Sequence, residues 1–289
     1  MTDEEQSEDT MDDPTGDAPP RAGQPRRRRW LIILGIVLAV LVAGGGVVAV
    51  RWVRGSARPA SLSDTRRPTG TTLPSSRTVL RPPQGVYRYT GSGTDKLDRP
   101  PKEQAQGPDM PATVTHHPDG CWTFRIDYST NHWQSWDYCP RNGGLDEQGG
   151  TTYQKWDFGV FVNESTSTFT CNSPTIKADQ KPGDTWQQSC TGTTTGSEGV
   201  ARTAGPYRYV GPETLEIGGQ RVRAYRYHRE RTSSGSQSGG EQSDVWFSAE
   251  TGMPLRNQRH LEARTSTIIG DVSYTEDAEF RLSSIRPQS

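Results

Sequence analysis

The side chains best suited to acid–base or metal chemistry are five histidines, none of which belongs to a known catalytic motif. His116 and His117 are adjacent, with Asp119 close by, a composition that suits a metal site. Neighbouring side chains of a strand point to opposite faces, however, so one site cannot easily use both. His132 and Asp137 lie on one tryptophan-rich segment and form a conceivable base–carboxylate pair. The simpler interpretation is that all five, including His228 and His260, are ordinary surface or turn residues.

Catalytic motifs are absent from the sequence. It contains no G-x-S-x-G, H-E-x-x-H, P-loop or G-x-G-x-x-G pattern. Acidic residues are abundant, but none can be singled out as a glycosidase pair without geometry. The sequence therefore predicts a protein that is not an enzyme and uses no cofactor or metal, with a hydrolase as the least favoured alternative.

The four cysteines are Cys121, Cys139, Cys171 and Cys190. An even count in a region expected outside the cytoplasm predicts two disulfides, with three pairings open. We favour Cys121–Cys139 and Cys171–Cys190, because each closes a local excursion of similar length between adjacent strands. Each such loop stabilises by roughly 3 kcal/mol in the chain-entropy model. A zinc site is the alternative, but no pair has the short spacing typical of one.

Aromatic residues are the most distinctive feature of the chain. Five tryptophans fall between residues 122 and 186. Aromatic side chains fill β cores, but an exposed row stacks on sugar rings or lines an apolar groove. Because Trp133 and Trp136 are three residues apart, they face opposite ways in a regular strand. We take Trp133, Trp136 and Trp156 as the candidate ligand contacts.

These residues lie in a succession of short alternating segments separated by turn signals. Residues 121–128 are dense in aromatic and branched side chains and follow the turn sequence Pro118-Asp119-Gly120. Farther on, two alternating segments flank Gly218-Gly219, as a two-residue hairpin requires. The pattern predicts a mainly β domain, an antiparallel meander or half-barrel, over residues 84–289.

A weak internal repeat is also present. Gly85-Val86-Tyr87-Arg88-Tyr89-Thr90-Gly91 is echoed by Gly205-Pro206-Tyr207-Arg208-Tyr209-Val210-Gly211, and Tyr225-Arg226-Tyr227 gives a partial third copy. Either duplication or chance explains one short match. We favour one continuous sheet whose two halves start alike.

Composition limits the function classes. The chain has 289 residues, of which 30% are hydrophobic, with 31 glycines and 21 prolines. These values exclude a compact helical enzyme over the whole length and indicate tails and loops around a modest core. The net charge is −1, and residues 84–289 show no basic stripe, so the sequence gives no support for nucleic-acid binding.

The N-terminal third predicts a membrane anchor. Residues 1–29 hold eight acidic side chains and almost nothing apolar, and predict a disordered cytoplasmic tail. Residues 30–50 are twenty-one residues without a charge, long enough to cross a bilayer as one helix. Residues 51–83 hold seven arginines and five prolines and predict an extended stalk. Residues 84–289 form the extracytoplasmic domain.

Other topologies fit the sequence less well. A cleaved signal peptide usually has a shorter apolar stretch and no 29-residue tail before it. Arginines flank both ends of the apolar segment, so the charge rule alone barely decides orientation. The four-arginine cluster Arg26 to Arg29 and the distal cysteines favour the N-terminus inside. The basic stalk either contacts anionic lipid or acidic wall polymer, or is a solvated spacer, which we favour.

Part of the sequence resembles a known family. The segment Asp244-Val245-Trp246-Phe247-Ser248-Ala249-Glu250-Thr251-Gly252-Met253-Pro254-Leu255-Arg256, with the hairpin before it, is similar to LolA/LppX-type half-barrel lipoprotein carriers. The match covers about 55 residues of 289, between Gly211 and Arg264. The whole ectodomain also resembles uncharacterised single-pass envelope proteins of actinobacteria. The resemblance implies a curved antiparallel sheet with an apolar concave face that carries or senses lipids. The chain differs from this family in three respects: it has two expected disulfides, a permanent anchor and no evident helical lid. A tethered protein of this kind does not act as a diffusible carrier.

Together these observations predict a membrane-anchored, extracytoplasmic, non-enzymatic binding module. Its ligand is a lipid, lipoprotein or wall polymer of the envelope, or a protein partner. The alternative is a structural or regulatory scaffold that links the cytoplasm to the envelope. A binding module requires a contiguous apolar groove or pocket, whereas a scaffold exposes flatter patches.

Overall fold

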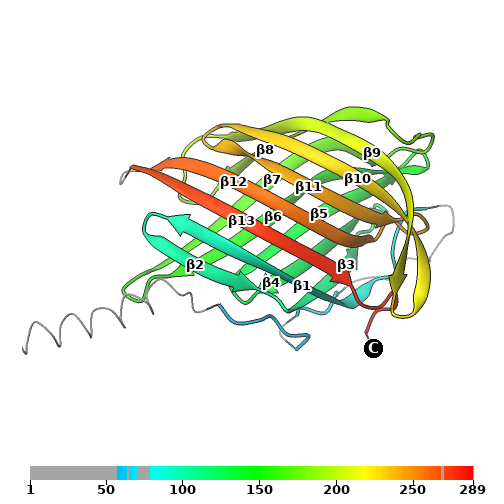
Figure 1. Ribbon diagram of the computed structural model, residues 1–289, viewed down its shortest axis with the longest axis horizontal. Helices are drawn as coiled ribbons and strands as arrows, with labels where there is room; N and C mark the ends of the chain where they lie inside the picture. Colours follow the sequence, from blue (N-terminus) through cyan, green and yellow to red (C-terminus); the bar gives the residue numbers. More distant parts are fainter. Residues whose placement is uncertain (1–56, 64, 70–78, 268–269, 289) are drawn as a thin grey trace, which may run out of the picture. The chain divides into compact units, whose positions relative to one another are not determined.

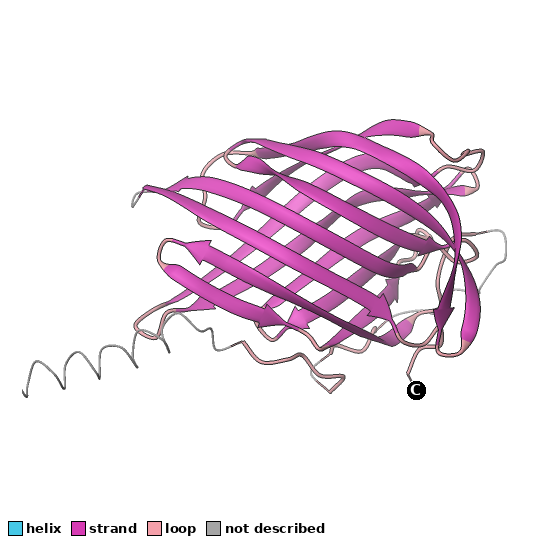
Figure 2. Cartoon of the chain, in the orientation of Figure 1, coloured by secondary structure: helices cyan, strands magenta, loops and turns pink. Residues whose placement is uncertain are grey.

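The structure is a computed structural model that describes residues 57–63, 65–69, 79–267 and 270–288. Strands make up most of this part of the chain, and no helix occurs in it (Figure 2). The mainly β prediction is therefore confirmed. The thirteen strands are β1 Gly85–Asp98, β2 Pro101–Gln106, β3 Asp109–His116, β4 Trp122–Ser129, β5 His132–Arg141, β6 Gly144–Asp157, β7 Val162–Ile176, β8 Thr185–Thr194, β9 Ala201–Ile217, β10 Gln220–Gly235, β11 Ser238–Ser248, β12 Pro254–Thr267 and β13 Gly270–Leu282.

The strands form an antiparallel meander that closes on itself. From β3 to β13 each strand pairs with the next along the chain, as predicted. The half-barrel prediction is wrong, because β1 also pairs with β13, from Tyr89↔Leu282 to Leu97↔Tyr274. On its other edge β1 pairs first with β3 and then with β2. The result is a closed barrel with no long free edge (Figure 1). Closure satisfies the backbone groups that an open edge would leave unpaired.

We call the two ends of the barrel the mouth and the base. The mouth carries the turns β1–β2, β6–β7, β8–β9, β10–β11 and β12–β13, and the base carries the β9–β10 turn and the C-terminal residues. In Figure 1 the β1–β2 and β12–β13 turns lie on the left and the C-terminus on the right. At the base, Gly218 and Gly219 have φ angles of 56° and 75°, which confirms the predicted two-residue hairpin.

Both predicted disulfides are present with the favoured pairing. Cys121–Cys139 joins the start of β4 to β5, and Cys171–Cys190 joins directly opposed residues of β7 and β8. The described residues contain no free cysteine, so a zinc–thiolate site is excluded there. Disulfides of this kind are typical of domains outside the reducing cytoplasm.

Large aromatic side chains fill the half of the barrel next to the base. Inward-facing positions of every second residue along each strand bury them against one another. Tyr89 contacts both Phe124 and Phe280 edge-on, with ring centroids 5.6 and 5.5 Å apart. The Tyr89 hydroxyl donates to the Pro254 carbonyl at 2.6 Å, so its one polar atom is satisfied. The core also includes Tyr87, Met110, Trp122, Tyr138, Tyr207, Tyr227, Phe247 and Leu282.

All three copies of the Tyr-x-Tyr segment contribute tyrosines to this core. Tyr87 and Tyr89 of β1 and Tyr207 and Tyr209 of β9 are all buried. The partial copy contributes Tyr227, whose ring stacks on Tyr207 with centroids 5.0 Å apart. One continuous sheet accommodates all three copies, as we favoured.

Part of the predicted stalk packs against the barrel. Arg58 forms two hydrogen bonds with Thr130, which lies in the β4–β5 turn. The Thr130 backbone N–H donates to the Arg58 carbonyl, and the Arg58 backbone N–H donates to the Thr130 hydroxyl. Farther along, the Arg66 carbonyl accepts from the Thr113 hydroxyl on the outside of β3. The side chain of Ala60 is buried. The chain therefore reaches the barrel at the mouth side and runs along the wall toward the base.

The predicted tail and anchor at 1–29 and 30–50 lie outside the described residues. Within the described ranges no helix is long and apolar enough to span a membrane.

Candidate functional site

A cavity of about 600 Å³ occupies the mouth half of the barrel interior. This volume is in the range of small-molecule sites, roughly 300–1,000 Å³. The walls toward the mouth are apolar and include Leu97, Trp156, Phe158, Phe161, Phe169, Leu261, Ala263 and Val272. Small polar residues such as Thr152, Ser165, Ser167, Thr203 and Ser233 fill the positions between them, and the Cys171–Cys190 bridge forms part of one wall.

Ionisable side chains close the cavity at its inner end. We call them the charged belt, because they come from strands around the circumference at one depth. Single strands show the layering: β12 presents Leu255 to the base, Arg259 to the belt and Leu261 to the cavity. The belt consists of Asp95, His132, Glu147, Arg229, Arg231, Glu241, Arg259 and Glu276.

One half of the belt is a network around Glu276 and Asp95, which are 1% and 0% exposed. Arg259 forms an ion pair with Glu276, and His132 Nδ1 lies 3.1 Å from Asp95 Oδ2. The Gln106 amide donates to Asp95 at 2.8 Å and to Glu276 at 3.2 Å. The Tyr274 hydroxyl lies 2.8 Å from Asp95 and 3.1 Å from Glu276. Arg259 also donates to the Gln134 amide oxygen, and the Gln106 amide nitrogen lies within hydrogen-bond distance of His132 Nδ1.

The other half is a network around Glu147 and Glu241. Arg229 forms an ion pair with Glu241, and its Nε donates to the Ser243 hydroxyl at 3.1 Å. Glu147 lies between two guanidinium groups, 3.8 Å from Arg229 and 3.5 Å from Arg231. Two buried arginines therefore share Glu147.

The environment of the belt favours the charged forms of Glu241 and His132. Burial alone raises the pKa of Glu241, but Arg229, Arg259 and Arg231 outweigh it and lower that pKa to about 2. For His132, burial lowers the pKa, but Asp95 and Glu276 more than compensate and the net pKa is raised. With His132 protonated, four cations face four carboxylates. A balanced set of this kind is tolerated in a low-dielectric interior where an unpaired charge is not.

Within this balanced set, Arg231 has the weakest pairing with a carboxylate. Burial lowers its pKa, and the neighbouring charge of Arg229 lowers it further. Its closest carboxylate oxygen is 3.5 Å away, its other contact is the Gln188 amide oxygen at 2.9 Å, and its Nε has no hydrogen-bond partner among the described residues. The side chain is 8% exposed and lines the cavity. Arg231 therefore presents an incompletely neutralised cation to whatever enters.

Two groups of donors in the belt have metal-ligand spacing. The ligand atoms of Asp95, His132 and Glu276 lie within 4.8 Å of one another, as do those of Glu147 and the two wall cysteines. The cysteines are oxidised to a disulfide and cannot serve as thiolate ligands. The carboxylates of the first group already accept from Gln106, Tyr274 and Arg259. The network accounts for these residues as a structural assembly.

The three aromatic residues predicted as ligand contacts separate into two groups. Trp136 and Trp156 line the cavity, so the structure brings them together. Trp133 faces the outer wall, stacked on Tyr153 and beneath the Arg125 guanidinium 3.9 Å from its ring centroid. Trp133 and Trp136 do face opposite ways, as their spacing predicts.

The histidines are not all surface residues, contrary to the simpler interpretation. His132 is fully buried in the belt, and its partner is Asp95 instead of Asp137. His116 is also buried, with Nε2 2.8 Å from the Pro82 carbonyl, while the His117 ring contacts Thr123. The two side chains therefore form no joint site.

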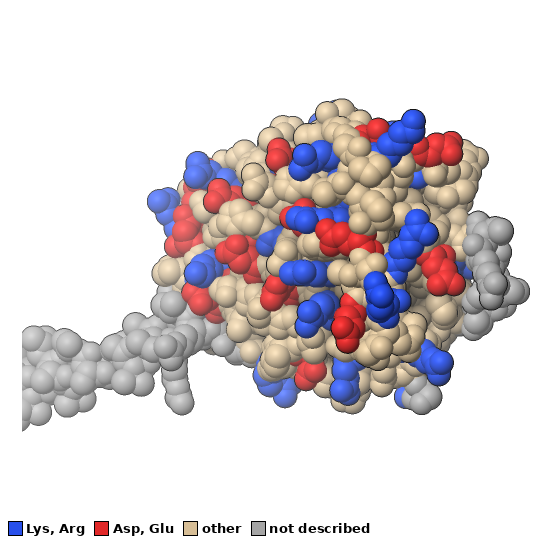
Figure 3. Space-filling model, turned by 45° about the vertical axis from the view of Figure 1, so that its right-hand side comes forward, with Lys and Arg blue, Asp and Glu red and all other residues tan. Residues whose placement is uncertain are grey.

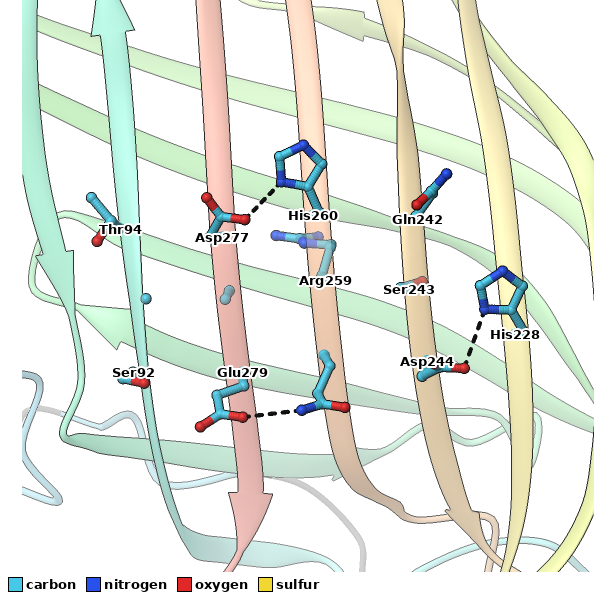
Figure 4. A pocket seen from close by; sticks show the side chains of 13 residues that line it. Ser92, Thr94, His228, Gln242, Ser243, Asp244, Arg259, His260, Asp277 and Glu279 are labelled. Atoms are coloured by element: carbon cyan, nitrogen blue, oxygen red, sulfur yellow. Dashed lines mark hydrogen bonds and ion pairs between the residues drawn. The ribbon is translucent and has the colours of Figure 1, made fainter.

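A second depression of about 580 Å³ lies on the outer wall over β1 and β10 to β13 (Figure 4). His260 lies between Asp277 and Glu262, and His228 lies between Asp244 and Glu230, so both rings are held by carboxylates. This surface is open to solvent, and positive and negative side chains alternate over the wall in view in Figure 3. The enclosed cavity is the better candidate site, because only an enclosed site desolvates a ligand.

Sequence reasoning missed the charged belt. In β10 the inward Arg229 and Arg231 alternate with the outward His228, Glu230 and Thr232, so both faces are polar and no hydrophobic period marks the buried one. The sequence signal that could have indicated the belt is the occurrence of charged residues at positions of a strand where the alternation places the buried face.

Comparison with known proteins yields little. No family model matches the chain, and no curated protein matches it. Among solved structures, the hypothetical lipoprotein YmcC from Escherichia coli K12 aligns with 12% identity and a TM-score of 0.27. The alignment covers 68% of this chain and 88% of that one. A similarity at this level supports no inference about ligand or activity.

Proposed function

We propose that this protein is an extracytoplasmic, non-enzymatic binding module that holds an amphipathic envelope ligand inside its barrel. Of the ligand classes expected from the sequence, a lipid-like molecule with an anionic head group fits best. The single observation that carries the proposal is the cavity, which is apolar toward the mouth and charged at its inner end.

The chemistry of the two ends gives the ligand an orientation. An apolar chain gains by contact with Trp156, Phe169 and Leu261 near the mouth. A carboxylate or phosphate at the inner end gains a charge-assisted hydrogen bond from the guanidinium of Arg231, which lines the cavity and lies 3.5 Å from its nearest carboxylate oxygen. The ligand therefore enters head group first.

The size and closure of the site also favour a small ligand over a polymer or a folded partner. The closed barrel leaves the mouth as the way in, and the base is filled by aromatic side chains. A wall polymer or a protein needs an open groove or a flat surface. Together with the predicted anchor, this supports a tethered receptor or holding protein at the membrane.

The test uses the full chain in detergent micelles and native mass spectrometry with palmitate as the probe. Palmitate combines an apolar chain with one carboxylate, and 1-hexadecanol has the same chain without the charge. Arg231→Gln removes the cation at the site. Arg223→Gln is the matched control, because Arg223 lies on the same strand and is exposed on the outer surface.

We expect palmitate to bind the natural chain and R223Q equally, and R231Q about tenfold more weakly or worse. Binding of 1-hexadecanol should be weaker and insensitive to R231Q. Absence of palmitate binding, or equal binding to all three proteins, would contradict the proposal and favour the scaffold alternative.

A further inference from the structure

Large apolar side chains are exposed at the mouth. Val160 is 88% exposed, Phe161 52%, Val162 49% and Val200 49%. Val160 and Phe161 belong to the β6–β7 turn, and Val162 begins β7 directly after it. Val200 belongs to the β8–β9 loop, which also lies at the mouth. Within the described residues the one other large apolar side chain with comparable exposure is Ile285 at the base, at 36%.

The β6–β7 turn is held in position by packing beneath it. The backbone N–H of Phe158 donates to the Phe161 carbonyl at 2.9 Å, and the Phe158 and Phe161 rings stack with centroids 4.7 Å apart. Phe158 is buried and also lines the cavity. Val160 therefore stands at the tip of an ordered turn, where exposing it to water is unfavourable.

The path of the chain places the membrane at the same end. Arg58 is bonded to Thr130 in the β4–β5 turn, and the adjacent Asn131 carbonyl accepts from the backbone of Lys155, next to the cavity-lining Trp156. The predicted membrane span ends at Val50, eight residues before Arg58. Eight residues reach at most about 29 Å when fully extended. If the predicted anchor holds, this short tether favours the mouth over the base as the end that faces the bilayer.

We propose that the mouth of the barrel docks on the lipid bilayer, with the tip Val160-Phe161-Val162 inserted among the head groups. Valine and phenylalanine side chains at an ordered tip gain free energy when they leave water for the interfacial region. The cavity then opens directly onto lipid. This inference goes beyond ligand binding and does not depend on Arg231.

A second protein surface fits these observations less well. Stable interfaces bury about 800 Å² on each partner. Four partly exposed side chains divided between two turns provide only a small part of that area. The short tether acts in addition, because it holds the mouth next to lipid at a high effective concentration.

The experiment places one fluorophore at each end of the full chain. Val160→Cys and, as matched control, Ile285→Cys are each labelled with an NBD group and reconstituted in vesicles of phosphatidylethanolamine and phosphatidylglycerol. Both positions are exposed apolar residues, so neither substitution removes a buried contact. Some vesicles carry a lipid spin-labelled near the head group, which quenches NBD on contact.

We expect at least threefold stronger quenching at position 160 than at position 285, and a loss of that difference when Phe161→Asp is added. Equal quenching at the two positions, or none at position 160, would overturn the proposal. Quenching that disappears when vesicles carry fewer than one chain on average would identify a second copy as the occupant and would also overturn it. Because no ligand is added, failure here is distinguishable from failure of the palmitate test.

Discussion

The two halves of the barrel interior are built by the same alternation of side chains and have opposite properties. Next to the base, inward positions hold Tyr89, Phe124 and Phe280, which pack edge to face and leave little space. Next to the mouth, the same positions hold small polar residues and a few apolar ones around a cavity. The charged belt separates the two.

The difference shows how a wide barrel obtains both stability and an open interior. A closed sheet of this size has more interior than its side chains can fill unless the side chains are large. Aromatic residues fill it in one half, and smaller side chains leave a cavity in the other half. We therefore expect substitutions in the base half to affect stability, and substitutions in the mouth half to affect binding.

The largest effect is expected for Trp122→Ala in the base half. Trp122 is fully buried and donates from Nε1 to the Leu80 carbonyl at 3.1 Å. We expect its loss to lower the free energy of unfolding by about 3–5 kcal/mol. Leu261→Ala, which enlarges a cavity that already exists, should cost about 1 kcal/mol. Urea unfolding of both variants checks the comparison, and similar losses would contradict it.

The belt provides the next test. Glu276→Gln leaves Arg259 without its carboxylate in a buried site, and we expect a loss of about 3–5 kcal/mol. Glu279→Gln on the same strand faces outward and should change stability by less than about 0.5 kcal/mol. If both variants unfold at the same urea concentration, the belt contributes nothing to stability.

The two disulfides distinguish stability from binding. Removing either pair, as C121S/C139S or C171S/C190S, should cost roughly 3 kcal/mol, because the closed loops are of nearly equal length. Only the second pair forms part of the cavity wall. We expect C171S/C190S alone to change palmitate binding in the native mass spectrum, and a matching change in the other variant would argue against an interior site.

Acid should weaken the belt in a defined window. The pKa of Glu241 is lowered from 4.5 to about 2 in the folded state, so its contribution is complete above pH 4.5 and is lost as the pH falls toward 2. The expected loss is roughly 2–3 kcal/mol. The raised pKa of His132 acts in the opposite sense: its contribution is present below pH 6.5 and declines as the pH rises through the folded value. Urea unfolding of Glu241→Gln at several pH values should show a smaller loss of stability in acid than the natural chain, with the part due to Glu276, whose pKa is also lowered, remaining. An unchanged pH dependence would contradict this assignment.

The smallest effect belongs to the outer wall. His260 and Asp277 form an exposed pair at 2.7 Å, with side chains 48% and 70% exposed. Because solvent screens such pairs, Asp277→Asn should change stability by less than about 0.5 kcal/mol. A loss of several kcal/mol in thermal unfolding would show that the depression on the outer wall has a structural role that its exposure does not indicate.

Local features were predictable from the sequence because they are set by neighbouring residues. The Gly218–Gly219 hairpin and both disulfides lie between strands adjacent in the chain, and loop length and turn chemistry decide them. The opposite orientation of Trp133 and Trp136 follows from alternation alone. The anchor and tail were predicted from equally local patterns and stay predictions.

Closure and the belt were not predictable, because both depend on residues far apart in the chain. The pairing of β1 with β13 joins Tyr89 to Leu282, and no local pattern of either strand specifies the other. Likewise Asp95, His132 and Glu276 come from three distant strands, and each one alone has the pattern of an ordinary surface residue. The position of Trp133 outside the cavity was unpredictable for a related reason: alternation shows that two tryptophans face apart, but not which face is enclosed.

The pairing of the first strand with the last also has a consequence for biogenesis. The cavity does not exist until the final thirteen-residue strand, Gly270–Leu282, has been synthesised and paired with β1. Pairings of such long sequence separation form slowly. Until then two strand edges stay available for other chains. A chain that is truncated before this strand therefore lacks the closed cavity and exposes two strand edges to aggregation at the same time.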